Sequence, residues 1–155
     1  MKVSQLIKKD TLFIEDSFTD TDELYQYFSK HLKSKDIIGE SQLIKRLFIK
    51  RENLGSTAIG KGVATPHIFS DKFKDFFISL GLIRNGMPYK APDNQDVFLV
   101  FLIMSNDQYV SYHLKTLASI ARMVSNTKIV NTLKSSKDIT DLYNKFEEIE
   151  NQFKS

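Results

Sequence analysis

The sequence predicts an α/β fold in which strands lie between layers of helices. Three observations lead to this prediction: a continuous apolar run at 97–104, an alternating segment at 75–84, and segments of helical periodicity on both sides of them. A strand that is apolar at every position is typical of a sheet covered on both faces. The chain has 155 residues, enough for one such core and too few for two ordinary domains. Residues 1–155 are therefore predicted to form a single domain.

Three segments are expected to form the strands. Residues 11–14 are a short candidate, and 97–104 is the buried strand. Within 75–84, the side chains of Ile78, Leu80 and Leu82 point to one face, and those of Phe77, Ser79 and Gly81 point to the other. The Asn85-Gly86 pair that follows predicts a turn.

Two helices are predicted before the glycine-rich part of the chain. Asp20 is expected as an N-cap with Glu23 as its capping-box partner, and this helix runs to about Lys33. A second helix begins near Gly39 or Glu40. Its apolar stripe consists of Leu43, Ile44, Leu47 and Phe48, and Arg51 continues that stripe.

Helices are also predicted after the buried strand. Residues 105–107 (Ser-Asn-Asp) have the composition of a helix cap. The helix that follows has a predicted apolar stripe of Val110, Leu114, Leu117, Ala118, Ala121 and Val124. Two further helices are expected near 127–134 and 139–149.

The composition excludes several classes of function. The chain has no cysteine, so it has no disulfide, thiolate metal site or cysteine nucleophile. Its net charge of +3 comes from scattered basic residues, and no nucleic-acid binding is expected. The N-terminus does not have the pattern of a signal peptide, and the longest apolar run is far too short to insert into a membrane. A cytoplasmic location follows by elimination.

His67 is the first candidate for chemistry. It follows Pro66, which fixes its own φ and stiffens the chain. It also closes a segment, 55–67, predicted to be a loop in which Gly55, Gly60 and Gly62 allow close approach to a ligand. A rigidly held histidine in such a loop is a reasonable nucleophile. The alternative is a loop histidine without a chemical task.

Three other side chains could act with His67 or could have a structural role only. Arg51, on the inward face of its helix, needs a partner or an anion, although its long side chain could also reach water. His113 lies one position off a predicted apolar stripe, where it could be structural or could face His67. His31 takes a core-facing position and is interpreted as structural.

Two other kinds of site fit the sequence poorly. Residues 55–62 nearly match the phosphate loop G-x-x-x-x-G-K-[ST], but Gly62 stands where the magnesium-binding hydroxyl belongs, and the segment follows a helix instead of a strand. A metal hydrolase is the other alternative. The three histidines lack metal-ligand spacing, so no metal or other cofactor is predicted.

The segment from Arg51 to His67, Arg-Glu-Asn-Leu-Gly-Ser-Thr-Ala-Ile-Gly-Lys-Gly-Val-Ala-Thr-Pro-His, resembles the signature of the EIIA domains of the fructose/mannitol class of the phosphotransferase system. Its motif Leu-Gly-Ser-Thr-x-Ile-Gly-x-Gly is similar to that of the nitrogen-regulatory branch of this class. Asp93-Asn94-Gln95-Asp96-Val97 and His113-Leu114 also match in kind and order. The resemblance covers nearly the whole chain.

The resemblance implies a mixed sheet sandwiched between helices and a phosphotransferase activity. His67 would be the phosphorylated residue, His113 the second active-site histidine and Arg51 the active-site arginine. The phosphate donor would be a small histidine-phosphorylated carrier protein of the HPr kind. The acceptor would be an EIIB component in sugar transport or, as the alternative, phosphorylation of His67 would gate binding to a regulated target protein.

Two positions depart from the family pattern. Thr65 stands before the proline, where the family usually has an aliphatic residue, and Ile68 stands after the histidine, where it usually has glycine or alanine. Ile68 and Phe69 are expected to form an apolar rim that meets the carrier. No metal or nucleotide is required, because the donor is already an activated phosphohistidine.

Overall fold

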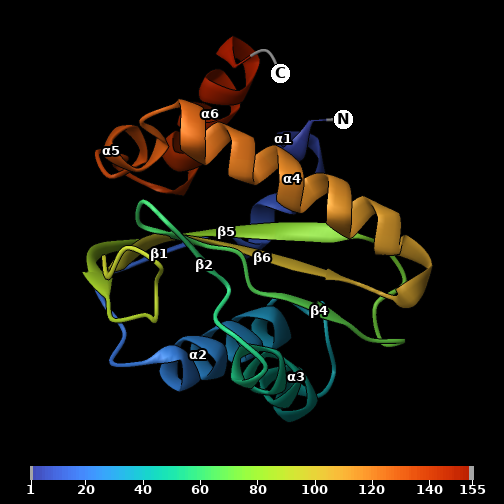
Figure 1. Ribbon diagram of the computed structural model, residues 1–155. Coiled ribbons are helices and arrows are strands. Elements are labelled where there is room, and N and C mark those ends of the chain that lie inside the picture. Colours follow the sequence, from blue (N-terminus) through green and yellow to red (C-terminus); the bar gives the residue numbers. More distant parts are fainter. Residues whose placement is uncertain (1, 154–155) are drawn as a thin grey trace.

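A six-stranded mixed sheet lies between two layers of helices (Figure 1). The computed structural model describes residues 2–153. The strands are β1 (Phe13–Glu15), β2 (Ala58–Gly60), β3 (Val63–Ala64), β4 (His67–Phe69), β5 (Phe77–Met87) and β6 (Val97–Ser105). The helices are α1 (Val3–Leu6), α2 (Thr21–Ser34), α3 (Ser41–Asn53), α4 (Val110–Asn126), α5 (Ile129–Leu133) and α6 (Ile139–Gln152). Short 3₁₀ turns lie at Lys9–Thr11 and Asp107–Tyr109.

The sheet combines parallel and antiparallel pairs in the order β1-β5-β6-β3-β2, with β4 also paired to β6. The pairs β1/β5, β3/β6 and β4/β6 are parallel, whereas β5/β6 and β2/β3 are antiparallel. The mixed sheet between helices that the sequence resemblance implies is thus confirmed. No helix within residues 2–153 is long and apolar enough to cross a lipid bilayer.

Each face of the sheet carries its own hydrophobic core. Helices α1, α4, α5 and α6 cover one face, and α2 and α3 cover the other (Figure 1). On β6 the side chains of Leu99, Phe101 and Ile103 enter the first core, and those of Val100, Leu102 and Met104 enter the second. The continuous apolar run therefore faces helices on both sides, as predicted. Ile78, Leu80 and Leu82 of β5 also share one core, as their alternation indicated.

The predicted helix boundaries are close to those observed. Asp20 is the N-cap of α2, because its carboxylate accepts a hydrogen bond from the backbone N–H of Glu23 at 2.9 Å. The Glu40 side chain caps α3 by accepting from the N–H of Gln42. Asn106, not Ser105, caps the 3₁₀ turn before α4, while Ser105 is the last residue of β6.

Three predicted local features are wrong. The predicted stripe of α4 is correct for Leu117 and Val124, which face the core, but wrong for Val110 and Leu114, which are exposed. The other buried residues of α4 are His113, Thr116, Ile120 and Met123. The sheet, not the hydropathy of the helix alone, decides which face of α4 is covered. The chain does not turn at Asn85-Gly86, because β5 continues to Met87 through an irregular register. The predicted loop 55–67 contains β2, β3 and the first residue of β4.

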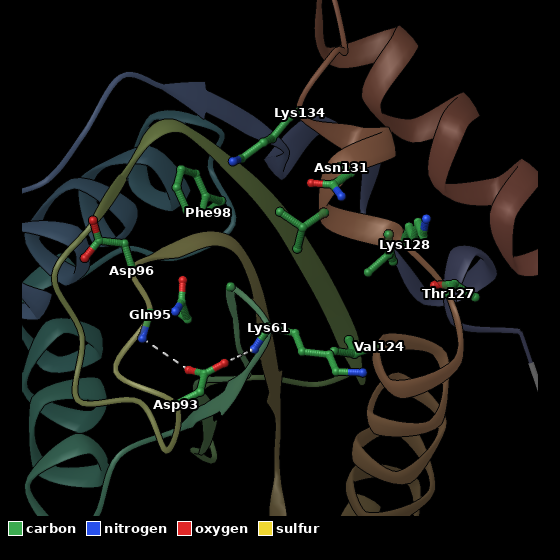
Figure 2. Close-up of a pocket in the computed structure, with 13 residues that line it drawn as sticks. Lys61, Asp93, Gln95, Asp96, Phe98, Val124, Thr127, Lys128, Asn131 and Lys134 are labelled. Carbon is green, nitrogen blue, oxygen red and sulfur yellow. Dashed lines mark hydrogen bonds between the residues drawn. The ribbon is translucent and has the colours of Figure 1, made fainter.

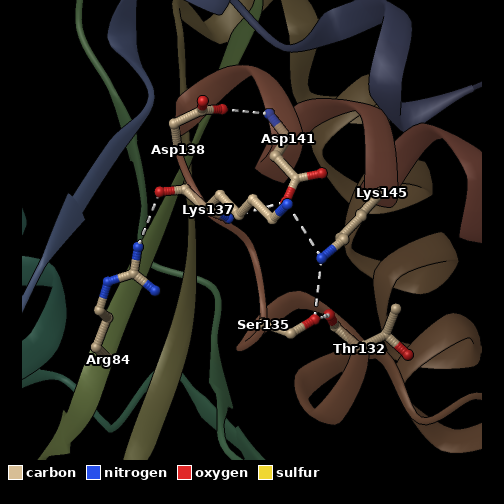
Figure 3. A network of polar contacts seen from close by, with 7 residues as sticks. All are labelled: Arg84, Thr132, Ser135, Lys137, Asp138, Asp141 and Lys145. Carbon is tan, nitrogen blue, oxygen red and sulfur yellow. Dashed lines mark hydrogen bonds and ion pairs between the residues drawn. The ribbon is translucent and has the colours of Figure 1, made fainter.

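The corner between α5 and α6 is held by polar contacts that Figure 3 shows. The Asp138 carboxylate accepts from the N–H of Asp141, and the Asp141 carboxylate accepts from the N–H of Lys137. Lys145 pairs with Asp141 at 3.2 Å, and the guanidinium of Arg84 on β5 donates to the Lys137 carbonyl. These groups are at the surface, so they fix the direction of α6 more than they stabilise the fold.

Replacing Gly81 with alanine tests how closely β1 and β5 pack. Gly81 is the register partner of Phe13, and a methyl group at Gly81 would overlap the Phe13 ring. We expect Gly81→Ala to lower the free energy of unfolding by about 1–3 kcal/mol, measured by urea denaturation, because the buried ring must move. Gly39→Ala is the control, since no atom lies within 4 Å of its added methyl group. Equal stability of the two variants would contradict this packing.

Candidate active site

A proline interrupts one long strand at the position of the candidate histidine. Both β3 and β4 pair with β6 in the same register, with Val63 beside Leu99 and His67 beside Ile103. Between them lies Pro66, which has no N–H to donate, although its carbonyl accepts from the N–H of Ile103 at 2.9 Å. His67 is therefore the first residue after the break, and β4 pairs with β6 alone in the described part of the chain.

Two neighbours determine which nitrogen of His67 carries the proton. The Nδ1 atom lies 2.9 Å from the Thr65 carbonyl oxygen, which can only accept. The Nε2 atom lies 3.3 Å from Nε of Arg51, which can only donate. The neutral ring therefore carries its proton on Nδ1 and a lone pair on Nε2, and the lone pair faces the guanidinium.

The surroundings of His67 keep its ring neutral near pH 7. Burial lowers the pKa of His67 below 6.5, and the positive charge of Arg51 lowers it further. The hydrogen bond to Thr65 and the nearby Glu52 carboxylate act in the opposite direction without reversing the shift. A neutral histidine with a free lone pair is a competent nucleophile at that pH.

Arg51 and its neighbour Glu52 end α3 in a network of hydrogen bonds. The Arg51 guanidinium donates through Nη1 to the Gly55 carbonyl at 2.9 Å. The Glu52 carboxylate accepts from the N–H and hydroxyl of Thr57, both at 2.8 Å, and from the hydroxyls of Tyr25 and Tyr89. The sequence analysis missed Glu52, although it directly follows Arg51. This carboxylate joins α3 to the start of β2 and so holds Arg51 beside His67.

His113 approaches His67 from the opposite helix layer. Its side chain is 2% exposed and belongs to α4. The ring stacks on Phe69 at 4.1 Å between centroids and meets Phe76 edge-on at 5.1 Å. The ring centroids of His67 and His113 are 6.3 Å apart. Burial, with a smaller effect of His67, lowers the pKa of His113 to about 4, so this ring is also neutral at pH 7.

The geometry brings all three predicted residues together. Arg51 comes from the α2/α3 side of the sheet and His113 from the α4 side, and both reach His67 at the start of β4. The Arg51 guanidinium donates to Nε2 of His67 at 3.3 Å, and the centroid of the His113 ring lies 6.3 Å from that of His67. Such an arrangement can hold an anionic group bound to His67.

The prediction that Ile68 and Phe69 form an exposed apolar rim is wrong for Ile68. Successive side chains of a strand point to opposite faces. Ile68 is 4% exposed and packs in the α2/α3 core, whereas Phe69 is 38% exposed on the same side as His67. The bulk of Ile68 therefore does not crowd Nε2 of His67. The other unusual residue, Thr65, is also buried, and its hydroxyl donates to the Thr57 carbonyl.

His31 and the phosphate-loop-like segment lie outside this arrangement. His31 is half-buried on α2, where its Nε2 donates to the Thr11 carbonyl and its ring stacks on Tyr27. The segment 55–62 leads into β3, so no helix N-terminus follows Lys61 as a phosphate loop requires. Within residues 2–153, no three histidine or carboxylate side chains form a cluster able to hold a metal ion.

Lys61 instead lines a cavity of about 490 Å³ between the β2–β3 turn, the start of β6 and α5 (Figure 2). Its backbone N–H donates to the Asp93 carboxylate at 2.8 Å, and its ammonium group donates to the Ser125 carbonyl. The Asp93 carboxylate and the Lys61 ammonium group are thus each bound by another group of the protein.

Comparisons with known proteins identify the family of this chain. Residues 5–149 match the family described as phosphoenolpyruvate-dependent sugar phosphotransferase system, EIIA 2. A nitrogen regulatory protein of Bradyrhizobium diazoefficiens is 32% identical over 112 residues, covering 72% of this chain and 73% of that protein.

Two solved structures show the same fold. The crystal structure of the nitrogen regulatory protein IIA-Ntr from Neisseria meningitidis has a TM-score of 0.82 at 20% identity, covering 92% of this chain and 97% of that one. The Escherichia coli enzyme IIA for mannitol, solved in complex with phosphorylated enzyme IIB, has a TM-score of 0.72 at 13% identity, covering 90% and 95%. The family match over residues 5–149, together with this fold, defines a phosphotransferase-system IIA domain. The chain belongs to the EIIA type 2 family of that system.

Removing the charge of Arg51 should raise the pKa of His67. In the native protein we expect this pKa below 6.5, and Arg51→Gln should move it upward because a positive charge that opposes protonation is lost. The pKa is read from the ring signals of His67 in an NMR titration. Arg46→Gln, an exposed position on the same helix, should leave it unchanged. A native pKa above 6.5, or no upward change in Arg51→Gln, would contradict the described contact.

Proposed function

We propose that this EIIA domain is a phosphohistidine carrier in which Nε2 of His67 accepts a phosphoryl group from a histidine-phosphorylated carrier protein and passes it to an EIIB component. One observation supports this proposal above the others. The Thr65 carbonyl holds the proton of His67 on Nδ1, so Nε2 keeps an unprotonated lone pair, which accepts a hydrogen bond from Nε of Arg51. A nucleophile needs this lone pair, and the phosphoryl group needs the cation.

The transfer exchanges one phosphorus–nitrogen bond for another. The lone pair of His67 Nε2 forms a bond to phosphorus while the bond to the donor imidazole breaks, and that electron pair returns to the donor nitrogen. The donor ring carries a proton on its other nitrogen, so it leaves as a neutral imidazole, and the positive ring charge passes to His67. The proton on Nδ1 of His67 stays in its hydrogen bond with Thr65 throughout. Since the bonds formed and broken are of the same kind, the step is nearly balanced in free energy. A balanced step suits a carrier, which must also release the group.

Arg51 and His113 are proposed to stabilise the transferred group. The transition state of phosphoryl transfer is loose, so the protein contributes mainly positioning and charge. When Nε2 forms its new bond, the Nε–H of Arg51 loses its acceptor there and can donate to a phosphoryl oxygen. Its terminal N–H groups can add a second bond in the forked geometry that guanidinium groups use for phosphate. His113, neutral at pH 7, can contribute one N–H from the other side.

Exposed apolar side chains beside the site support a protein as the phosphate donor. Leu54 is 80% exposed and follows the end of α3, Leu114 is 64% exposed beside His113, and Phe69 is 38% exposed. Large apolar groups exposed in this way are typical of protein contact surfaces. Phe69 therefore stays part of the proposed contact surface for the carrier, and Leu54 and Leu114 take the place of the buried Ile68.

A regulatory role is the second candidate, and the relatives support it. The nitrogen regulatory protein of Bradyrhizobium diazoefficiens is 32% identical to this chain. In this role phosphorylation of His67 gates binding to a target protein and no sugar is moved. An acceptor assay separates the two roles: the phosphorylated protein is mixed with EIIB domains, and rapid loss of label supports transport. Retained label together with phosphate-dependent capture of a target supports regulation.

Replacing His67 with alanine tests the proposal. Incubation with phosphoenolpyruvate and the general phosphotransfer proteins should give one acid-labile phosphate per chain, detected by mass spectrometry. His67→Ala should lose this label completely, because the substitution removes the unprotonated nitrogen beside Arg51. The control is His31→Ala, which removes a histidine outside the site and should keep the label. Label retained in His67→Ala would move the phosphorylated residue elsewhere and overturn the proposal.

A further inference from the structure

The ring of His113 is held in place by three contacts, of which only one is polar. Phe69 stacks on it and Phe76 meets it edge-on, so the plane of the ring is fixed. The hydroxyl oxygen of Ser105 lies 2.6 Å from Nε2 of His113. The remaining nitrogen, Nδ1, is buried and has no hydrogen-bond partner among the described residues. A buried polar atom without a partner is rare in folded proteins, and the ring that carries this one has its centroid 6.3 Å from that of His67.

The single proton of the Ser105 hydroxyl decides what Nδ1 of His113 can do. This hydroxyl can donate either to His113 Nε2 at 2.6 Å or to the Asn106 carbonyl at 3.0 Å. If it donates to Nε2, the neutral ring must carry its own proton on Nδ1. If it donates to Asn106, the ring proton lies on Nε2 and Nδ1 is a bare acceptor.

The two distances favour donation to His113. Hydrogen bonds with a hydroxyl donor are shorter than those with an N–H donor, and 2.6 Å is short even for a hydroxyl. The chemistry favours the same arrangement. A bare nitrogen acceptor would repel a phosphoryl oxygen, whereas an N–H would bind it. The N–H on Nδ1 of His113 has no acceptor in the unphosphorylated protein, and a phosphoryl group on His67 would supply one.

The strand pair that positions the nucleophile also positions Ser105. His67 and Phe69 on β4 are the register partners of Ile103 and Ser105 on β6. Because the side chains alternate along β6, Ser105 lies on the same face of the sheet as Ile103, toward α4. Its side chain is fully buried under His113. The same two strands therefore place the reactive ring and, through Ser105, the second ring.

We propose that Ser105 is a positioning residue for phosphoryl transfer: it donates a hydrogen bond to Nε2 of His113 and so keeps the His113 proton on Nδ1, where it can bind a phosphoryl oxygen on His67. This inference rests on the proposed phosphocarrier function and assigns a role to a residue that never contacts the reacting atoms. The chemical group recognised is the phosphoryl group on His67.

The test combines the tautomer of His113 with the rate of phosphorylation. Two-bond ¹H–¹⁵N NMR spectra of the native protein should place the His113 proton on Nδ1. Phosphorylation of His67 is then followed with phosphoramidate, a small donor that needs no docking surface. In Ser105→Ala we expect the preference for the Nδ1 proton to be lost and the rate to fall on the order of tenfold, the effect of one hydrogen bond to a charged group. Ser105→Thr, which keeps the hydroxyl, should restore both.

Ser79→Ala is a matched control for the loss of a buried serine hydroxyl. Ser79 is fully buried on β5, and its hydroxyl donates to the Thr11 carbonyl far from His113. This variant should keep the native tautomer and rate. If Ser105→Ala does not fold, the native tautomer decides, and a His113 proton on Nε2 overturns the inference. A folded Ser105→Ala with the native rate also overturns it, while His67 stays the phosphorylated residue. Failure of the native protein to accept phosphate on His67 from any donor would instead refute the phosphocarrier function itself.

Discussion

The hydrogen bond between Nδ1 of His67 and the Thr65 carbonyl is the interaction on which the rest of the site depends. It spans the break that Pro66 makes between β3 and β4, where the strand continues in register but one backbone donor is missing. At this break the Thr65 carbonyl accepts its hydrogen bond from the ring of His67. The backbone thus assigns the proton to one nitrogen and exposes the lone pair of the other. Arg51 and His113 become useful only because that lone pair has a fixed direction.

The sandwich architecture supplies these two partners from opposite layers. The α2/α3 layer carries Arg51, which the Glu52 network holds at the end of α3. The α4 layer carries His113, buried between two phenylalanines over the β4/β6 pair. A histidine in the centre of the sheet could face only one layer, because strand side chains point to one side or the other. At the start of β4, which pairs with a single strand, both layers can reach the same ring. The edge of the sheet is therefore the place where a donor cation and a second imidazole can approach one nucleophile.

Much of this arrangement could be predicted from the sequence, and the failures have physical reasons. The apolar run predicts a strand covered on both faces, which β6 confirms, and the structure places Arg51 in contact with His67. The strands within 55–67 have two or three residues each, too few for a periodic pattern. The stripe of α4 was misplaced because Leu114 is exposed while His113 is buried, an inversion that only the partner surface explains. Serine is a common helix-capping residue, so the sequence places Ser105 at the start of a helix. Its burial under His113 follows only from the register of β4 on β6. The roles of the three site residues and the cytoplasmic location stay predictions.

The most direct test of this account is the position of the phosphoryl group on the His67 ring. In ¹⁵N-labelled protein phosphorylated by its donor, NMR coupling between phosphorus and the ring nitrogens identifies the bonded atom. We expect a phosphoryl group on Nε2, with the proton still on Nδ1 and bound to Thr65. A phosphoryl group on Nδ1 would contradict this expectation, because that bond cannot form while Nδ1 donates to the backbone.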